Sequence, residues 1–377
     1  MIEVTIDAVA AGGDGIGRLD GKAVFVAGAV PGDVVTADVV VDKPRFTRAR
    51  LDDLITPSPL RRSMPCPHAA ECGGCSWQMV ERTVQAGWKQ EAVVAALARI
   101  GRFDQVTVRP ILTPGPEFGY RNRLDLHPSP GGPGFHRAGS HDVVAIGLCL
   151  LAAPAVAALV DEVVGRAGEG DLTLRAGTRT GEAVIIGPGH AAPGEAVITE
   201  IVDGVRFQVS GRAFFQPNTD GAETLVELVR QAAGEPGGVL VDAYAGVGLF
   251  SATVGEPFER VVAIESSRRA VGDLRRNVPT AEVLALPAHL GLPRLDGDVD
   301  VAVVDPPRDG MDGAALAALI AARPRVVVSV SCDVATFARD ARLMADSGYE
   351  LEWVQPVDQF PHTPHVETVA RLVRQDT

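Results

Sequence analysis

Residues 238–248 read GVLVDAYAGVG, and this segment is the strongest indication of the fold of the C-terminal half of the chain. Its apolar, β-branched first half predicts a buried strand. Gly246 and Gly248 predict a tight turn in which the backbone approaches a ligand closely. Residues 249–255, LFSATVG, then open a helix. A strand, a glycine-rich turn and a helix in this order are typical of nucleotide-binding α/β domains.

The alternation of strands and helices continues from this stretch towards the C-terminus. Further strands are predicted at 260–265 (RVVAIE), 299–307 (VDVAVVDPP) and 324–332 (PRVVVSVSC), and further helices at 267–277 and 335–348. Nearly continuous apolar strands that alternate with helices indicate a parallel sheet covered on both faces. Residues 211–377 are therefore expected to form a Rossmann-like α/β domain.

The N-terminal part has a different pattern. Short β-branched segments separated by glycine and proline turns predict a five-stranded OB-like barrel over residues 1–56. The proline-rich segment 56–67 resembles a linker, and apolar periodicity predicts a helix over 77–101. Residues 103–210 mix short strands and loops, so 57–210 is treated as a central domain of undetermined fold.

Composition and charge restrict the class of protein. With 377 residues, 46% hydrophobic and 22% charged, the chain has the composition of a globular protein of two or three domains. No apolar run reaches the length of a membrane span, and residues 1–9 do not resemble a secretory signal, so we expect a cytoplasmic protein. We also expect it to be a monomer. The net charge of −13 arises after residue 150. Residues 43–62 are basic, which suits either a solvated face or a phosphate backbone.

The glycine-rich turn suits two kinds of nucleotide ligand. Glu265 ends the next strand, where a carboxylate accepts hydrogen bonds from ribose hydroxyls. A dinucleotide fingerprint has a third glycine where this chain has Ser251. The pattern therefore favours S-adenosylmethionine over a dinucleotide, with a simple packing turn as the alternative.

The five cysteines divide into two groups. Cys66, Cys72 and Cys75 are closely spaced and Cys149 follows later, a set that suits either an iron–sulfur cluster or a zinc ion. Cys332 instead follows a predicted strand, at the sheet edge where reacting groups gather in α/β folds. The alternative for Cys332 is a small buried apolar side chain.

Several segments together resemble the RNA uracil-5 methyltransferases, which use S-adenosylmethionine to make 5-methyluridine. The resemblance is carried by FFQPNTDGAETL (214–225), VDAYAGVGLF (241–250), AIESSRRAV (263–271), VVDPPRDGM (303–311), VSVSCDVATFARD (328–340) and VQPVDQFPHTPHVETVARL (354–372). The cysteine set and the N-terminal barrel, which resembles a TRAM domain, are similar to the larger members of the family.

The resemblance implies specific roles. Cys332 is expected to be the nucleophile and Glu367 the general base. The residues expected around the cofactor and the target base are Gln216, Tyr244, Gly246, Gly248, Glu265 and Asp305. The four remaining cysteines, Cys66, Cys72, Cys75 and Cys149, are expected to bind a [4Fe–4S] cluster in the central domain. Leu249 and the pair Ala288-His289 depart from the family, the first from a frequent asparagine and the second from an acid or amide that binds adenine.

The resemblance also suggests partners. RNA is the expected substrate, held by the barrel and the basic stretch 43–62 while a flipped uridine enters the pocket. Phe214 and Phe215 either stack on a base or pack, and His362 and His365 are interpreted as loop residues that position Glu367. Members with both a TRAM domain and a cluster mostly modify ribosomal RNA, so 23S rRNA is favoured and the tRNA T-loop is the alternative. A non-catalytic iron–sulfur RNA-binding protein and a nicotinamide-dependent oxidoreductase are competing hypotheses of other classes.

Overall fold

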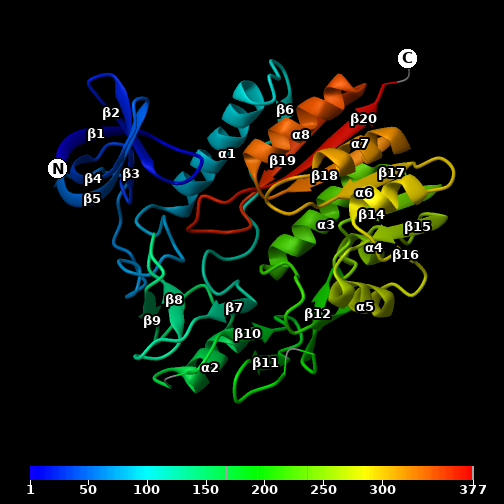
Figure 1. Cartoon of the computed structure of the whole chain (residues 1–377), viewed down its shortest axis with the longest axis horizontal. Helices are drawn as coiled ribbons and strands as arrows, with labels where there is room; N and C mark the ends of the chain where they lie inside the picture. Colours follow the sequence, from blue (N-terminus) through cyan, green and yellow to red (C-terminus); the bar gives the residue numbers. More distant parts are fainter. Residues whose placement is uncertain (167, 193, 236, 376–377) are drawn as a thin grey trace.

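The computed structural model describes residues 1–166, 168–192, 194–235 and 237–375. A small barrel lies at one end of the molecule, a larger α/β domain at the other, and a region of short strands between them (Figure 1). Within the described residues, no helix combines the length and the apolar character needed to cross a membrane.

The N-terminal barrel is closed in the strand order β1-β2-β3-β5-β4. Its strands are β1 (Ile2–Val9), β2 (Gly15–Leu19), β3 (Lys22–Ala27), β4 (Val34–Asp42) and β5 (Phe46–Thr56). Alternate side chains such as Val4, Ile6, Val24 and Val26 fill the interior, as the period-2 pattern requires. The barrel predicted for residues 1–56 is thereby confirmed.

The proline-rich segment after the barrel is fixed to it. Ser58 donates its backbone N–H to Asp33 over 2.8 Å, and Arg61 forms an ion pair with the same buried carboxylate. Arg62 pairs with Glu81 and Glu117. Arg61 and Arg62 therefore already have carboxylate partners within the protein, and contact of the basic stretch 43–62 with RNA stays a prediction.

The central region consists of short antiparallel units. Its elements are β7 (Arg123–Leu126), β8 (Gly134–His136), β9 (Val143–Ala145), α2 (Pro154–Val163), β10 (Leu172–Ala176), β11 (Ala183–Ile186), β12 (Val197–Val202) and β13 (Val205–Ser210). Strands β11, β10 and β7 form one sheet, and α2 packs on it through a small apolar cluster. The lack of a sequence-based fold for this region reflects these short elements, which have too few residues to show a clear period.

The C-terminal domain is built on an eight-stranded sheet in the order β16-β15-β14-β17-β18-β20-β19-β6. Its strands are β6 (Thr107–Val108), β14 (Val239–Ala243), β15 (Arg260–Ile264), β16 (Glu282–Leu284), β17 (Val301–Val304), β18 (Val326–Ser331), β19 (Tyr349–Val357) and β20 (Glu367–Arg374). The sequence predicted a parallel sheet, but β20 runs antiparallel to both of its neighbours. Because the chain reverses between β19 and β20, the first residue of β20 lies at the carboxyl edge of β18.

Helices cover both faces of this sheet. One face carries α3 (Thr219–Ala233), α4 (Leu249–Thr253) and α5 (Arg268–Asn277); the other carries α1 (Arg82–Arg99), α6 (Ala288–Gly291), a short 3-10 turn (Leu292–Arg294), α7 (Gly313–Ala322) and α8 (Val334–Asp346). Successive residues of β17 alternate between the two cores, with Val303 on the α3 side and Val304 on the α8 side. In this layered arrangement the carboxyl ends of the parallel strands lie along one edge of the sheet.

Helix α1 begins later than predicted. The apolar pattern predicted a helix over 77–101, whereas the helix extends over Arg82–Arg99. The backbone N–H groups of Ser76 and Trp77 both donate to the carbonyl oxygen of His362, so they are committed to a distant segment. Helix α1 packs on α8 and β19, so this N-terminal segment is part of the wall of the C-terminal domain.

Candidate active site

Five of the residues expected in the site lie at one edge of the sheet. Tyr244, Glu265, Asp305 and Cys332 each follow the last residue of a parallel strand, namely β14, β15, β17 and β18. Glu367 is the first residue of antiparallel β20 and reaches the same edge from the opposite direction. The chain order reverses between β14 and β17, and ligands bind at such a switch point in open α/β sheets.

The turn after β14 has the geometry that its glycines predict. Gly246 and Gly248 have φ angles of 57° and 96°, in the left-handed region that glycine adopts without strain. A Cβ atom on Gly248 would lie 2.8 Å from side-chain atoms of Leu274 and Val278, so close packing also requires glycine there. Tyr244 adopts φ 67° although it is not glycine, which marks a backbone position held by its surroundings.

Two acidic side chains hold this turn. Asp242 is fully buried and accepts hydrogen bonds from the N–H and hydroxyl of Ser251, over 2.9 and 2.6 Å. Glu265 accepts from the N–H of Gly246 over 2.8 Å and from Ser267 over 2.6 Å. Ser251, which replaces the third glycine of a dinucleotide fingerprint, therefore has a structural role in orienting Asp242.

Two cavities lie on either side of Tyr244 and share its side chain. One is lined by Gln216, Phe214, Leu249 and Asp305 among others. The other is lined by Glu265, His289 and Asp312 among others. Tyr244 is thus common to two neighbouring cavities, one beside the glycine turn and Asp305 and the other beside Glu265. The departures noted at Leu249 and His289 both lie on the walls of these cavities.

Cys332, Glu367 and Asp305 form one electrostatic group at this edge. Burial, together with the nearby carboxylates of Glu367 and Asp305, raises the pKa of the Cys332 thiol to about 11. Burial and the charge of Asp242 raise the pKa of Asp305 to about 7. Burial, followed by the charge of Asp305, also raises the pKa of Glu367 well above its ordinary value. The three groups are therefore close enough to influence one another.

This concentration of buried acids indicates the charge of the ligand. Asp242, whose pKa burial raises to about 6, adds a further acid beside the other three groups. The pKa of each of these groups stays raised in the protein, which means that its negative form is not stabilised by nearby positive charge. A cationic ligand would supply that charge, so the site favours one. A sulfonium nucleoside supplies a positive charge, whereas the pyrophosphate of a dinucleotide would add negative charge. The electrostatics thus support the choice of S-adenosylmethionine.

Gln216 is held by a buried network. Gln359 donates from Nε2 to Gln216 Oε1 over 3.2 Å, and Asn122 donates from Nδ2 to the Gln216 carbonyl oxygen over 2.9 Å. A Cβ atom on Gly221 would overlap Gln359, so this glycine makes room for the amide. Because Gln359 occupies the oxygen of the Gln216 amide, the NH₂ group of Gln216 remains for a ligand in the cavity.

The two phenylalanines before Gln216 differ in environment. Phe215 is buried and packs on Phe207 with ring centroids 5.6 Å apart. Phe214 lines the cavity with Asp305 and is 64% exposed. Packing therefore explains Phe215 but leaves Phe214 as a surface at the entrance.

The four cysteines of the first group are brought together by the fold. Cys66, Cys72, Cys75 and Cys149 all line one cavity in the central region. Burial, together with the charges of the other three thiols, raises the pKa of Cys75 to about 12. Within the described residues, however, no three His, Cys, Asp or Glu side chains are arranged to hold a metal ion.

Sequence reasoning missed three polar residues of this site. Arg308 is exposed, and its positive charge lowers the pKa of both Cys332 and Glu367. Arg308 and Gln359 lie inside the quoted segments 303–311 and 354–372, so their polarity was a signal that could have been followed. Asn122 lies in a region without a recognisable motif, and nothing in its local sequence indicates its contact with Gln216.

Comparison with known proteins identifies two domains of known families. Residues 1–51 match the TRAM domain, and residues 201–287 and 294–375 match the family described as tRNA (Uracil-5-)-methyltransferase. An uncharacterized RNA methyltransferase of Gloeobacter violaceus is 35% identical over 99% of this chain and 96% of its own length. A similar protein of Thermosynechococcus vestitus is 33% identical over 98% of this chain and 97% of its own length.

A solved structure is similar over the whole chain. It is the Pyrococcus abyssi tRNA (uracil-54, C5)-methyltransferase in complex with S-adenosyl-L-homocysteine. Its TM-score is 0.78 and its sequence identity 25%, with 99% of this chain and 100% of that chain covered. Together with the family matches and the arrangement at the sheet edge, this similarity shows that the chain belongs to the S-adenosylmethionine-dependent RNA (uracil-5-)-methyltransferases.

Proposed function

We propose that this enzyme methylates C5 of one uridine in RNA, with Cys332 as nucleophile and Glu367 as general base. The observation that carries this proposal is the meeting of a thiol and a buried carboxyl at the sheet edge, where both are influenced by Asp305, a residue that lines one of the cavities. Uracil C5 is too weak a nucleophile to accept a methyl group directly. A thiolate that adds to C6 converts the ring to an enolate, which makes C5 reactive.

The two residues then act in sequence. S-adenosylmethionine supplies an electrophilic methyl group, and C5 of the enolate forms a bond to it. Glu367 takes the proton from C5, the electrons of that C–H bond restore the C5–C6 double bond, and the Cys332 thiolate leaves. The raised pKa of Glu367 makes its carboxylate a stronger base than an ordinary glutamate.

The residues around the cavities have proposed binding roles. Glu265 and the glycine turn would hold the ribose, while Gln216, Tyr244 and Asp305 would lie around the sulfonium end and the target base. Phe214 would contact a base at the entrance because its ring is exposed there. The uridine must leave its stack to present C5 and C6, so we expect base flipping.

We propose 23S rRNA as the substrate, supported by the combination of a TRAM domain with a four-cysteine site. Lys43, Arg45, Arg48 and Arg50, on or beside β5 of the barrel, would contact phosphates. A tRNA is the second candidate, favoured by the similarity to the Pyrococcus abyssi enzyme.

Methyl transfer from labelled S-adenosylmethionine to separate 23S rRNA and tRNA transcripts tests the substrate. Nucleoside analysis of each product identifies the modified base. 5-Methyluridine in 23S rRNA alone supports the first candidate, and 5-methyluridine in tRNA alone replaces it with the second. The absence of product from both, with S-adenosylhomocysteine still bound, would favour a non-catalytic RNA-binding protein.

We further propose that Cys66, Cys72, Cys75 and Cys149 bind a [4Fe–4S] cluster. The four thiols surround one cavity, and their mutual repulsion as thiolates requires positive charge at its centre. A single zinc ion draws its sulfur ligands to about 2.3 Å from one point. A cluster binds each thiolate at a different corner, which suits side chains that ring a cavity rather than converge on one ion.

Anaerobic purification followed by iron, sulfide and zinc analysis tests this centre. We expect a brown protein with about four iron atoms per chain. A colourless and fully active protein with one zinc per chain would contradict the cluster and support zinc.

A further inference from the structure

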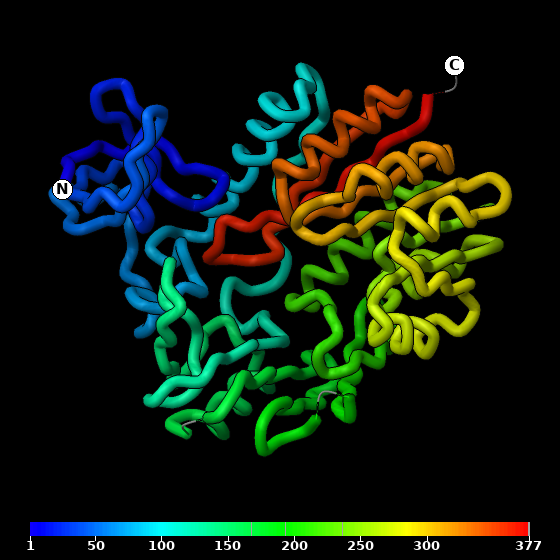
Figure 2. The backbone as a smooth tube through the Cα atoms, in the orientation of Figure 1, coloured from blue at the N-terminus to red at the C-terminus, as the bar shows by residue number. Residues whose placement is uncertain are grey.

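The loop that joins β19 to β20, residues 358–366, leaves the sheet and enters the junction between the barrel and the central region. Figure 2 shows it as the red segment that extends away from the α/β domain. The loop contacts the barrel, the segment 76–77, helix α1 and Tyr120. Pro364 packs against Gly13 of the barrel, where an added Cβ would lie 3.1 Å from the proline ring. Glu367 follows directly at the end of this loop.

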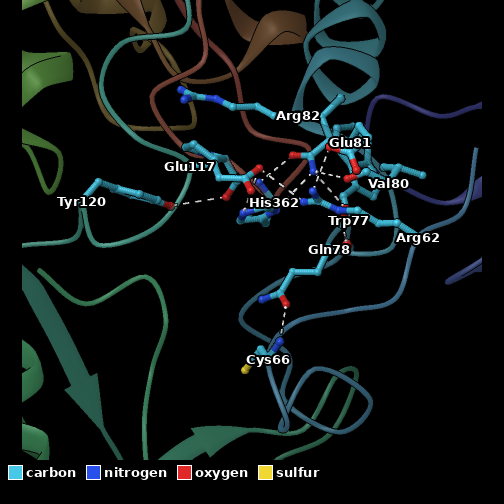
Figure 3. Close-up of polar contacts among 12 residues, drawn as sticks. Arg62, Cys66, Trp77, Gln78, Val80, Glu81, Arg82, Glu117, Tyr120 and His362 are labelled. Carbon is cyan, nitrogen blue, oxygen red and sulfur yellow. Dashed lines mark hydrogen bonds and ion pairs between the residues drawn. The ribbon is translucent and has the colours of Figure 1, made fainter.

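The first connection runs from the segment that contains Cys75. The next two residues, Ser76 and Trp77, donate their N–H groups to the His362 carbonyl oxygen over 2.9 and 3.0 Å. Gln78 accepts through Oε1 from the N–H of Cys66 over 3.2 Å. The short segment 75–78 therefore connects two of the four cysteines to the loop, Cys75 through the chain and Cys66 through Gln78. Figure 3 shows Cys66, Gln78, Trp77 and His362 of this connection.

The second connection runs from the segment that contains Cys149. Leu150 and Leu151 accept through their carbonyl oxygens from Gly119 and Arg121, over 2.8 and 2.7 Å. Tyr120, which lies between Gly119 and Arg121 in the chain, is buried and donates its hydroxyl to the Pro361 carbonyl oxygen over 3.4 Å (Figure 3). Both cysteine-bearing segments therefore end on adjacent residues of the same loop.

Gln85 of α1 joins the two sides of this junction. Its Oε1 accepts from the N–H of His362 over 2.7 Å, and its Nε2 donates to the Trp77 and Val80 carbonyl oxygens over 3.0 and 2.9 Å. The same Nε2 lies 3.2 Å from His362 Nδ1. Gln85 is fully buried, so these bonds have no competition from water.

His362 is held in a conformation that requires such support. Its φ is 67°, in the left-handed region that side-chain-bearing residues seldom adopt. Its ring stacks on Phe118 with centroids 4.4 Å apart, and it is fully buried. A conformation of this kind persists only where the surroundings determine it, so loss of the neighbouring bonds should release the loop.

We propose that the cysteine-bearing segments position Glu367 through the loop 358–366, so that occupancy of the cysteine centre governs removal of the C5 proton. Gln85, Trp77 and Tyr120 are positioning residues in this scheme, since they touch the loop and not the substrate. The inference rests on the proposed roles of Glu367 and of the four cysteines. It assigns the centre a place in one step of the reaction instead of a general stabilising role.

Removal of the C5 proton and binding of the methyl donor depend on different segments of the chain in this scheme. The two cavities at the sheet edge are lined by the segment 214–216 and by residues between Tyr244 and Asp312. No residue of the loop 358–366 is part of their lining. Gln359, the residue of the loop that holds Gln216, is fixed separately by Asn218 at the start of α3, whose Nδ2 donates to the Gln359 carbonyl oxygen over 3.1 Å. A loop loosened at Pro361 and His362 would therefore leave S-adenosylhomocysteine bound while Glu367 lost its position. The Cys332–C6 bond and the C5–methyl bond would form, but the C5 proton would remain and the thiolate could not leave.

The first test compares Gln85→Leu with Gln90→Leu in the metal-loaded protein. Gln90 lies on the same helix and donates to the Arg109 carbonyl oxygen, away from the loop, so it is a matched control. Hydrogen exchange should become at least about tenfold faster in peptides covering 358–366 of Gln85→Leu, because the bonds that hold His362 are lost. A methylated RNA–protein adduct should accumulate on denaturing gels, with metal content and S-adenosylhomocysteine affinity within about twofold of the parent protein. Gln90→Leu should behave as the parent protein.

The second test empties the centre with Cys66→Ala and repeats both measurements. The same loop should lose protection and the same adduct should accumulate. Unchanged exchange of 358–366 in either Gln85→Leu or Cys66→Ala would overturn the proposal. Should Cys66→Ala fail to fold, Gln85→Leu alone decides the outcome. Failure of the parent protein to methylate any RNA would instead contradict the proposed function, and the exchange measurement would still report on the loop.

Discussion

Ser331 and Thr368 are paired across β18 and β20, and Thr368 Oγ1 donates to the Ser331 carbonyl oxygen over 3.2 Å. The next residue towards the sheet edge is Cys332 on one strand and Glu367 on the other. The antiparallel register therefore brings the backbone of the nucleophile and that of the base side by side, and the proposed role of the loop before Glu367 is to position the carboxyl group itself. A register shift of one residue would turn one of them to the opposite face of the sheet.

Cys332→Ala should abolish methyl transfer while the methyl donor still binds. We expect a loss of at least about a thousandfold in turnover, because the C6 adduct has no other nucleophile. Labelled methyl transfer measures the loss, and calorimetry with S-adenosylhomocysteine should give an affinity within about twofold of the parent protein. Retained methylation would rule out the covalent route.

Glu367→Gln should trap the enzyme on its RNA. The amide cannot accept the C5 proton, so the Cys332–C6 bond should persist after methyl transfer. A slowly migrating protein–RNA band on a denaturing gel reports this adduct. Glu350→Gln on β19 is a suitable control, because Glu350 is exposed and pairs with Gln375 at the far end of the hairpin. Rapid release of methylated RNA by Glu367→Gln would mean that another group removes the proton.

Glu265→Gln should weaken binding of S-adenosylhomocysteine by about 10- to 100-fold, the value of one or two charge-assisted hydrogen bonds to the ribose. Glu282→Gln, on the next strand, removes only an exposed ion pair with Arg260 and should leave affinity unchanged. Calorimetry on both variants makes the comparison. Equal affinities for the two variants would show that Glu265 does not contact the ligand.

The pH dependence of ligand choice should reveal the charge of Asp305. Its pKa is raised to about 7 by burial and by Asp242, so the carboxylate forms as the pH rises through neutrality. The preference for S-adenosylmethionine, which carries a sulfonium charge, over the neutral S-adenosylhomocysteine should therefore increase between about pH 5.5 and 8.5.

In Asp305→Asn this preference should change much less over the same pH range, and the remaining change should come from Asp242 and Glu367, whose pKa values are also raised. Calorimetric titration of both ligands at several pH values measures it. A preference in the parent protein that does not change with pH would exclude Asp305 as the partner of the sulfonium.

Much of the fold was predictable because its signals are local. Strands β14, β15, β17 and β18 were expected from apolar runs, and the turn at Gly246 from its glycines. The antiparallel strand β20 was not expected, because the direction of a strand depends on the path of the loop before it. The start of α1 was misplaced by the apolar pattern, since Ser76 and Trp77 are bonded to a segment far away in sequence.

The amino-acid sequence alone predicted the chemical groups of the protein: a glycine turn after a strand, acids and a thiol at strand ends, and a separate group of four cysteines. These features depend on residue type and on short-range geometry. The contacts between these side chains became visible only in the tertiary structure. It placed Arg308 beside Cys332 and Glu367, joined Gln359 to Gln216, paired Arg61 with Asp33, and connected both cysteine segments to the loop before Glu367. Such contacts depend on packing between distant segments, and a local pattern carries no record of the neighbour that burial will bring to it.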